Sequence, residues 1–348
     1  MELKYNFIKK MVASNINKKS VILYLNVIEL HEGWGAEYFM NQGFLANGDQ
    51  TITIDYRKYR HQLADKLLAA RDFDVFFLQR GDNYPLQLLK AVNRPKFFWS
   101  TELVARCRDQ DRLFKCGLFD HVFVHTEECR RAVINRKWLT PDKVSVFLPG
   151  FDQDTHKKYA DIEKDIDILH IGVLTERRTQ ILEELKKDFS VKIEKAYGEE
   201  MAKLFNRAKI VLNIHGDKYI DTETRIFEAL GCGAFVISEK LGDESPVTDG
   251  EHLVEVSDID GFKKKIRYYL SNENERDLIA TAGHEKALIE FTCTAKAKYI
   301  ADFMGSYSIY NNKESLNRNL IYRYKISSFF LNYVKRILNK LRRIFFKL

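Results

Sequence analysis

The sequence predicts an α/β protein of two domains, each built on a parallel sheet that helices cover on both faces. Short apolar runs alternate with helical stretches from residue 20 to about 150, and the alternation starts again at residue 166. This alternation is typical of βαβ units, whose parallel strands are buried on both faces. With 348 residues, the chain is long enough for two cores of ordinary size.

The first domain is expected over residues 1–152 as a Rossmann-like fold. Helical spacing occurs between its apolar runs, for example from Tyr59 to Ala70 and from Pro85 to Ala91. A turn at Pro149 and Gly150 ends the pattern. The expected strands are Val21 to Ile28, Thr51 to Asp55, Val75 to Gln79, Lys96 to Trp99, Val122 to Val124 and Val144 to Leu148.

The second domain is expected over residues 153–305. A polar linker precedes it, and a helical region from Ile259 to about Phe303 ends it. Its expected strands are Ile166 to Ile171, Val191 to Lys195, Ile210 to Ile214, Ala234 to Ser238 and His252 to Val256.

Polar residues gather at one end of the βαβ unit in residues 209–239. The strand Ile210 to Ile214 leads through a loop to a helix that starts near Thr222, and Arg225 and Glu228 lie three apart on that helix. Ligands of parallel sheets bind at the carboxyl ends of the strands, and a helix N-terminus favours a phosphate. We therefore expect Arg225 to hold a diphosphate and Glu228 to accept hydrogen bonds from a ribose diol. Alternatively, both are solvated charges on an amphipathic helix.

These residues occur in an order that resembles a known family. The segment LNIH, then TETRIFEALGCGAFVIS, a charged loop and a strand ending HLVEV, is similar to the C-terminal half of family 1/family 4 type glycosyltransferases (glycosyl transferases group 1), in particular the CgeB-like branch. The resemblance covers residues 165–303, and the first 150 residues only by pattern. It implies the GT-B fold, with two Rossmann-like domains facing each other across a cleft and a nucleotide-sugar donor on the second domain.

The resemblance also implies roles for single residues. Glu228, in the R-x-F-E-A motif, would hold the ribose, and Gly231 and Gly233 would let the backbone approach the donor. IGVLTERR resembles the first loop of the donor domain, where Arg177 or Arg178 would contact the diphosphate. The candidate donor-binding residues are Glu228, Gly172, Arg177, Arg178, Tyr197, Gly198, Asn213, Thr222, Glu223, Gly231 and Gly233.

One position departs from the family pattern. The wider family carries two glutamates in an E-x7-E arrangement, but the residue eight positions before Glu228 is Ile220. Either Glu223 replaces the missing glutamate, or the main chain alone holds the sugar.

Two catalytic candidates follow from the chemistry of sugar transfer. Arg225 and a helix N-terminus can stabilise the leaving diphosphate without a metal. The first domain should supply a general base for the acceptor hydroxyl, and Glu102, after the apolar run 97–99, is the main candidate, with His31 and Glu32 as alternatives. If the enzyme retains the anomeric configuration, as the resemblance suggests, the leaving phosphate can accept the proton instead.

Other classes of enzyme lack their motifs here. G-x-G-x-x-G and G-x-S-x-G are both absent, which argues against nicotinamide binding and a serine nucleophile. Five D-x-D matches occur, as chance predicts in a chain with 30% charged residues. We expect no metal site and no cofactor beyond the nucleotide-sugar co-substrate.

The C-terminal tail, residues 306–348, is expected to form a basic amphipathic helix. Nine Lys or Arg and no acid lie in residues 318–348, so the rest of the chain sums to 7 − 9 = −2. Its apolar stripe is Phe330, Val334, Ile337, Leu341, Ile344 and Leu348. A basic amphipathic helix favours an anionic membrane surface, and we expect residues 317–348 to bind one. The alternative is a helix packed on the body or on a second copy.

Together these observations predict a metal-independent, retaining glycosyltransferase that transfers a sugar from a nucleotide sugar to a lipid-linked or cell-envelope glycan. Five scattered cysteines and no recognisable leader indicate a cytoplasmic protein, peripheral at the inner face of the membrane. The alternative is a non-catalytic module that binds nucleotide sugars. A third possibility, nucleic-acid binding through the tail, is disfavoured because the rest of the chain is not basic.

Overall fold

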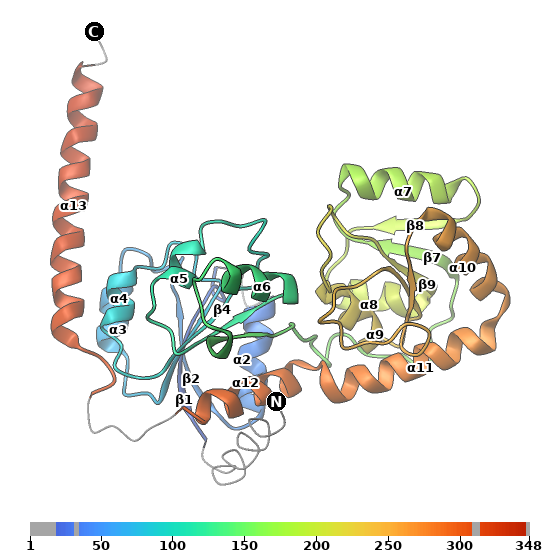
Figure 1. Cartoon of the computed structure of the whole chain (residues 1–348), viewed down its shortest axis with the longest axis horizontal. Helices are drawn as coiled ribbons and strands as arrows, with labels where there is room; N and C mark the ends of the chain where they lie inside the picture. Colours follow the sequence, from blue (N-terminus) through green and yellow to red (C-terminus); the bar gives the residue numbers. More distant parts are fainter. Residues whose placement is uncertain (1–18, 31–34, 308–313, 346–348) are drawn as a thin grey trace.

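The computed structural model describes residues 19–30, 35–307 and 314–345, which form two α/β lobes (Figure 1). The first lobe is built on a parallel sheet with the strand order β2-β1-β3-β4-β5-β6. The second is built on a parallel sheet with the order β11-β10-β9-β7-β8. The predicted α/β class with two parallel sheets is confirmed.

The first sheet follows the predicted apolar runs closely. Its strands are β1 (Val21–Asn26), β2 (Gln50–Asp55), β3 (Val75–Gln79), β4 (Lys96–Trp99), β5 (His121–Val124) and β6 (Val144–Val146). Its connecting helices are α2 (Ala36–Ala46), α3 (Leu63–Ala69), α4 (Leu86–Lys90), α5 (Asp111–Lys115), α6 (Glu127–Asn135) and the 3-10 turn η1 (Pro141–Lys143).

Helix α3 starts later than the spacing predicts. The carboxylate of Asp55 accepts hydrogen bonds from the backbone N–H groups of Arg57 (3.1 Å) and Lys58 (2.9 Å). Such local bonds hold the backbone in turns instead of a helix. The helix expected from Tyr59 therefore begins at Leu63.

Both faces of the first sheet are covered, as parallel strands require. Leu23 and Leu25 point into the core beneath α3 and α4. Their neighbours Ile22 and Tyr24 point to the opposite face, beneath α2. This burial on two sides explains why the inner strands, such as β1 and β3, have continuous apolar runs instead of alternating polar residues.

The second sheet is built in the same way. Its strands are β7 (Ile166–Ile171), β8 (Val191–Glu194), β9 (Ala208–Asn213), β10 (Val236–Glu239) and β11 (Val254–Val256). Its helices are α7 (Glu176–Lys186), α8 (Gly198–Arg207), α9 (Thr224–Gly231), α10 (Ile259–Ser271) and α11 (Glu273–Glu290).

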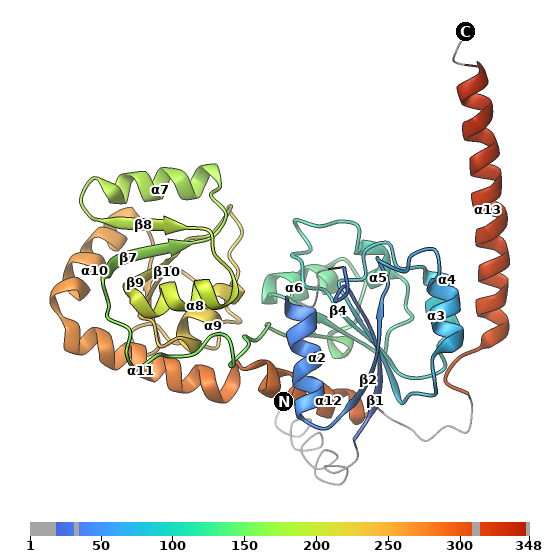
Figure 2. The ribbon, with the colours of Figure 1, turned by 180° about the vertical axis from the view of Figure 1, so that it is seen from behind.

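Helix α12 (Cys293–Gly305) returns from the second lobe to the first, where it lies beside α2 (Figure 2). Gly43 of α2 allows this approach, because a Cβ at that position would lie 2.4 Å from the carbonyl oxygen of Cys293. Ile300 and Met304 of α12 join the core of the first lobe. The packing differs here from the sequence analysis, which assigns residues 293–305 to the second domain.

The two chain crossings between the lobes pair with each other. Phe151 donates its backbone N–H to the carbonyl of Phe291 (2.9 Å), and Cys293 donates its own to the carbonyl of Phe151 (2.8 Å). Gly150 leaves room for this pairing, since a Cβ there would lie 2.6 Å from the Phe291 carbonyl oxygen. The lobes are therefore joined at a two-stranded crossing.

The C-terminal helix α13 (Arg318–Phe345) begins against the first lobe and then extends away from it (Figure 1). Ile321 is fully buried against α3 and α4, and Lys325 pairs with Asp65 (2.5 Å). After Lys325 the described apolar side chains are exposed. The tail is thus a helix, and its first turns belong to the core of the first lobe.

Candidate functional site

The carboxyl ends of β7 and β9 and the start of α9 bring several of the predicted donor-binding residues together. Gly172, directly after β7, has φ +146°, and a Cβ there would lie 2.6 Å from Arg225 Nη2. A larger residue would meet the guanidinium, so Gly172 makes room for Arg225. Arg225 Nη2 lies 3.1 Å from Glu223 Oε2, whereas the buried Nη1 has no hydrogen-bond partner among the described residues.

This unpartnered nitrogen is chemically informative. Buried polar groups are normally hydrogen-bonded, and an orphaned donor costs free energy. Burial also lowers the pKa of Arg225, although the nearby Glu223 carboxylate opposes that shift. The group lies in the first turn of α9, where free backbone N–H groups add positive potential. The arrangement suits an anion.

Arg178 makes its hydrogen bonds to other groups of the protein. Its Nε donates to the carbonyl of Ile214 (2.8 Å), its Nη1 to the carbonyl of Val173 (3.0 Å), and its Nη2 to Glu223 Oε1 (2.5 Å). Arg178 and Arg225 therefore share the Glu223 carboxylate. Glu223, which Arg178 holds in place, therefore sets the position of Arg225. We call Arg178, Glu223 and Arg225 the donor frame.

Arg177 is also paired. It makes two hydrogen bonds to the Glu239 carboxylate (2.8 and 2.5 Å) and one to the carbonyl of His215 (3.0 Å). Its side chain remains 39% exposed, whereas that of Arg178 is 7% exposed. Of the two arginines predicted to contact the diphosphate, only Arg177 is exposed enough to reach a bound molecule from its present position.

Glu228 lies one turn after Arg225 and faces the crossing between the lobes. Its Oε1 is 3.9 Å from Nε2 of His156, which is buried and has no hydrogen-bond partner among the described residues. Burial raises the pKa of Glu228 to about 7, and Arg225 acts in the opposite direction. A carboxyl group with this pKa changes its charge near neutral pH, so its hydrogen-bonding capacity depends on pH.

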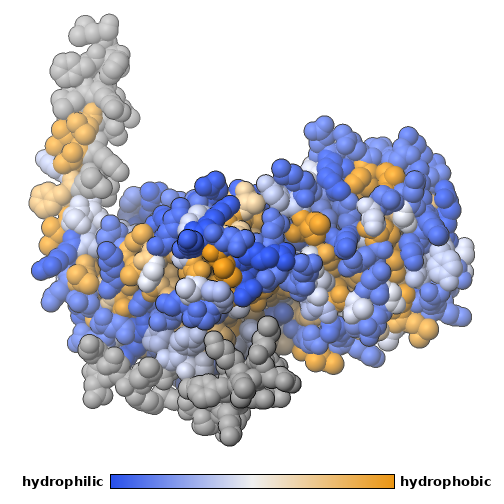
Figure 3. Space-filling model, viewed as in Figure 1, coloured by the Kyte–Doolittle hydropathy of each residue, from blue (hydrophilic) through white to orange (hydrophobic). Residues whose placement is uncertain are grey.

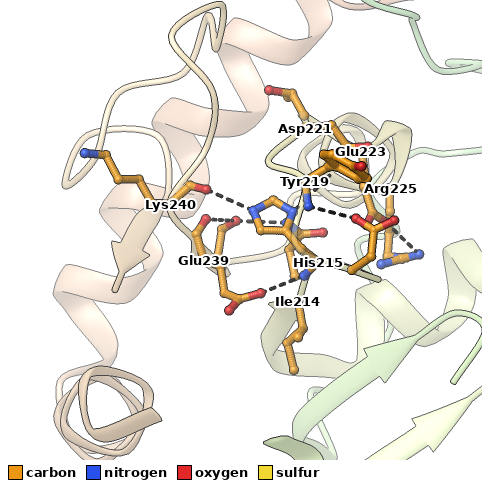
Figure 4. Close-up of polar contacts among 12 residues, drawn as sticks. Ile214, His215, Tyr219, Asp221, Glu223, Arg225, Glu239 and Lys240 are labelled. Carbon is orange, nitrogen blue, oxygen red and sulfur yellow. Dashed lines mark hydrogen bonds and ion pairs between the residues drawn. The ribbon is translucent and has the colours of Figure 1, made fainter. Parts of the chain in front are cut away.

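The loop between β9 and α9 contains a second polar cluster (Figure 4). His215 donates its backbone N–H to Glu239 (2.7 Å), and its Nε2 lies 2.9 Å from the carbonyl of Lys240. Its Nδ1 is 3.8 Å from Asp221 Oδ1. Burial alone would lower the pKa of His215, but Asp221 and the Lys240 carbonyl raise it.

His215, Asp221 and Glu223 bring three possible metal ligands within 4.8 Å of one another. Glu223 is already neutralised by Arg178 and Arg225. A divalent cation would lie beside these two guanidinium groups, and like charges repel. The arrangement therefore disfavours a cation at this cluster.

Sequence reasoning missed a histidine of the first lobe. His125 directly follows the buried strand β5 and lies within electrostatic reach of Asp221 and Glu223 of the second lobe. Burial lowers its pKa, Asp221 and Glu223 raise it, and Arg106 lowers it. The sequence does indicate that His125 lies at the carboxyl end of a strand, because it directly follows the apolar run Val122 to Val124.

Arg106 links the two lobes near this histidine. Its Nη2 lies 3.0 Å from Asp217 and 3.7 Å from Asp221, both in the β9–α9 loop. At the same boundary, Glu244 of the second lobe accepts the backbone N–H of Glu127 (3.1 Å), the first residue of α6. Acids of the second lobe thus meet positive groups of the first.

Glu102, the predicted base, lies in the loop between β4 and α5 and is partly exposed. Its backbone carbonyl accepts a hydrogen bond from Ser100 Oγ (3.2 Å). No ion pair of its carboxylate occurs among the described residues. The alternatives His31 and Glu32 lie outside the described residues. The role of Glu102 therefore stays a prediction.

Asn213 and Thr222 lie near the site but are buried. Asn213 Nδ2 donates to Ser238 Oγ (2.9 Å), and Thr222 Oγ1 lies 3.4 Å from Glu244. Tyr197, in contrast, is 61% exposed at the start of α8, next to Gly198 with φ +57°. Tyr197 is the aromatic ring of this group that a nucleobase could reach.

Gly231 and Gly233 lie close to other parts of the protein, and their predicted role at the donor stays a prediction. A Cβ on Gly231 would lie 2.3 Å from the ring of Phe151, and one on Gly233, which has φ +70°, would lie 3.0 Å from Lys158. Both glycines come at the far end of α9 from Arg225, where the helix packs on the crossing segment. Their small size serves packing within the protein, and their contacts give no support to an approach of the backbone to the donor.

Comparison with known proteins is consistent with this geometry. Residues 176–302 match the family model of the glycosyl transferase-like domain. No curated protein matches the chain. Among solved structures, sucrose-phosphate synthase from Thermosynechococcus elongatus has a TM-score of 0.59 at 13% identity, over 82% of this chain and 98% of the other.

Two further solved structures share the fold. Anabaena HepE in complex with UDP and glucose has a TM-score of 0.57 at 14% identity, over 82% of this chain and all of the other. Staphylococcus aureus TarM, as the G117R mutant with fondaparinux, alpha-GlcNAc-glycerol and UDP, has a TM-score of 0.51 at 14% identity, over 72% of this chain and 59% of the other. The GT-B fold predicted from the sequence is thereby confirmed.

Proposed function

Because residues 176–302 match the glycosyl transferase-like family model and the chain has the GT-B fold, we propose that it transfers a sugar from a nucleotide sugar to a lipid-linked or cell-envelope glycan. The observation that carries the proposal is the buried Arg225, whose Nη1 at the N-terminus of α9 has no partner among the described residues, with Gly172 beside it. HepE binds UDP and glucose, and TarM binds UDP with alpha-GlcNAc-glycerol, which supports a uridine nucleotide as the first donor to test.

In the proposed reaction, the bond between the anomeric carbon and the diphosphate oxygen breaks as the acceptor oxygen bonds to that carbon. Arg225 and the N–H groups of α9 stabilise the negative charge that builds on the diphosphate. Glu223 and Arg178 hold Arg225 in place, so little reorganisation is needed. No metal enters these steps.

The proton of the acceptor hydroxyl has two possible destinations. With retention of configuration, it passes to the leaving phosphate on the same face of the sugar. With inversion, Glu102 or His125 of the first lobe would accept it. We favour retention, as the resemblance of the sequence to family 1/family 4 type glycosyltransferases suggests.

Glu228 is proposed to accept hydrogen bonds from the ribose diol as a carboxylate. Its pKa of about 7 means that binding of a diol competes with protonation near neutral pH. Tyr197 is proposed to stack on the base, since its ring is exposed at the edge of the second sheet.

The test is binding and turnover of UDP-sugars. Calorimetric titration of UDP should show saturable binding, and a set of UDP-sugars should be hydrolysed slowly, or transferred when a glycan acceptor is present. Binding of UDP with no turnover of any donor would favour the non-catalytic module. No binding of any nucleoside diphosphate would reject both.

We also propose that α13 attaches the enzyme to an anionic membrane surface. After the packed residues Ile321 and Lys325, its described apolar side chains are exposed, and Figure 3 shows this apolar surface on the projecting helix. The exposed large apolar residues are Tyr322, Ile326, Phe329, Phe330, Tyr333, Val334, Ile337 and Leu338. No helix among the described residues is long and apolar enough to span a bilayer.

The packing of α13 determines how this proposal is tested. Removal of residues 317–348 would also remove Ile321 from the core, so truncation after Lys325 is the better variant. The truncated chain should lose its binding to phosphatidylglycerol vesicles and keep its affinity for UDP. Equal vesicle binding by the full and truncated chains would contradict the proposal.

A further inference from the structure

The first sheet contains a topological switch point that is formed by strands of the first lobe alone. Strand β1 lies between β2 and β3, so the chain leaves β1 toward one edge and later continues toward the other. In open parallel sheets, ligands bind outside the carboxyl ends of the strands at such a point. The turn directly after β3, residues 80–83, lies there.

The backbone of this turn has an uncommon conformation. Arg80 and Asn83 have φ of 65° and 56°, and Gly81 between them has φ 74°. The left-handed region is sterically unfavourable for arginine. Residues other than glycine in this region cluster at functional sites. Arg80 is held there by an ion pair with Glu37, whose side chain is 1% exposed and lies in the first turn of α2.

Three guanidinium groups surround the turn. Arg80 pairs with Glu37, and Arg57 makes hydrogen bonds through Nε (3.0 Å) and Nη2 (2.5 Å) to Asp82. Arg112 of α5 lies with Nη2 3.5 Å from the carbonyl oxygen of Gly81. The ion pairs of this cluster therefore use two carboxylates for three cations.

Arg112 is the cation left over. It is partly buried, and among the described residues it makes no ion pair. Burial lowers its pKa, and Asp109 is the strongest acidic influence that opposes this without pairing with it. A half-buried cation without a counter-ion is unfavourable for the free protein, and an arriving anion would remove that cost.

We propose that Arg112, with the Arg80 and Arg57 groups beside it, binds an oxyanion carried by the acceptor, either a phosphate or a carboxylate. The inference rests on the proposed function only in naming the ligand as acceptor. The planar fork of arginine suits both oxyanions. The site lies on the first lobe, apart from the Arg225 frame of the second, so acceptor and donor anions have separate binding groups.

The experiment uses inorganic phosphate and acetate as probes, with the full chain saturated with UDP to block the donor frame. Phosphate binding is followed by calorimetry for the wild type, Arg112→Gln and Arg108→Gln. Arg108 is the matched control, because it lies four residues before Arg112, in the loop that leads into α5, and is 72% exposed. A thermal melt of each variant shows that it is folded.

We expect saturable phosphate or acetate binding that weakens about tenfold or more in Arg112→Gln and less than about twofold in Arg108→Gln. The stronger of the two probes identifies the oxyanion. Absence of saturable binding in the wild type, or equal binding by the two variants, would overturn the inference. Failure of UDP to bind would count against the proposed function alone, since the comparison of the two variants still applies.

Discussion

The two lobes share one architecture but differ in whether every arginine at the edge of the sheet has a carboxylate partner. At the carboxyl edge of the second sheet, Arg178 and Arg225 share Glu223 and Arg177 pairs with Glu239. At the carboxyl edge of the first sheet, Arg57 and Arg80 are also paired with carboxylates, but Arg112 has no acid partner among the described residues. Arginines that carboxylates hold in fixed positions suit a ligand that is the same in every reaction cycle, such as a diphosphate. A looser set of cations suits a ligand whose shape varies.

The largest effect on the rate is expected from a substitution in the donor frame of the second lobe. Arg225→Gln should reduce kcat about 10²- to 10³-fold, because it removes one preorganised donor to the leaving diphosphate. Steady-state transfer assays measure this. Arg207→Gln, which breaks a surface pair with Asp165 on the same lobe, is the control and should behave as the wild type. Equal rates for the two variants would show that the frame has no role in catalysis.

The pH dependence of Glu228 tests the same frame. A carboxyl whose pKa is raised by folding binds more protons in the native than in the unfolded state, so its contribution to stability falls as pH rises from about 4.5 to about 7. The effect is at most about 3 kcal/mol. Glu228→Gln should remove this slope from denaturant unfolding measured across that range.

The same titration should appear in donor binding. UDP affinity of the wild type should increase as pH rises through 7, because the carboxylate accepts hydrogen bonds from the ribose. The affinity of Glu228→Gln should be lower and flat over this range. An identical pH profile for the wild type and Glu228→Gln would show that Glu228 does not bind the donor.

Two glycines distinguish the ligand-facing end of α9 from its packing end. Gly231→Ala should destabilise the chain by about 1–3 kcal/mol, because the ring of Phe151 must move. It should leave UDP affinity nearly unchanged if the residue serves packing. Gly172→Ala should weaken UDP binding, because its Cβ meets Arg225.

Gly250→Ala is the matched control for Gly172→Ala. Gly250 also has a positive φ, of 76°, but a Cβ there would meet no atom of the described residues within 4 Å. Both substitutions carry backbone strain of about 1–3 kcal/mol, and only Gly172→Ala disturbs the arginine. Thermal melts and UDP titration of the three variants separate strain from site geometry. Loss of UDP affinity in Gly231→Ala alone would restore the role that the sequence predicts for it.

The smallest effect is expected where the lobes meet. Glu244→Gln should cost about 0.5–1 kcal/mol, since a neutral side chain interacts more weakly with the N-terminus of α6. We expect a higher KM for the acceptor with little change in the affinity for UDP. Asp243→Asn is the control, because its pair with Arg131 is largely exposed and should contribute almost nothing.

The sequence predicts the central strands well because each is a short apolar run buried on both faces, whereas the edge strands β2 and β8 are partly exposed. It also predicts Arg225 and Gly172 separately as site residues, and the structure brings them together because the ends of parallel strands meet at one edge. It could not assign α12 to the first lobe, because the contact that places it depends on Gly43, some 250 residues earlier in the chain.

Roles that depend on contacts distant in sequence were the least predictable. Gly231 fits a family motif, yet its neighbour is the ring of Phe151 from the crossing segment. The left-handed Arg80 gives no sign in its sequence, because the residue that holds it is the buried Glu37 of another helix. His125 was available as a strand-end residue, but the acids that influence it electrostatically, Asp221 and Glu223, come from the other lobe.

The most direct test of the central claim is a crystal structure of the chain with UDP bound. The account predicts diphosphate oxygens within hydrogen-bond distance of Arg225 Nη1 and of the first backbone N–H groups of α9, with the ribose beside Glu228. A diphosphate bound elsewhere, with Arg225 still paired only to Glu223, would contradict it.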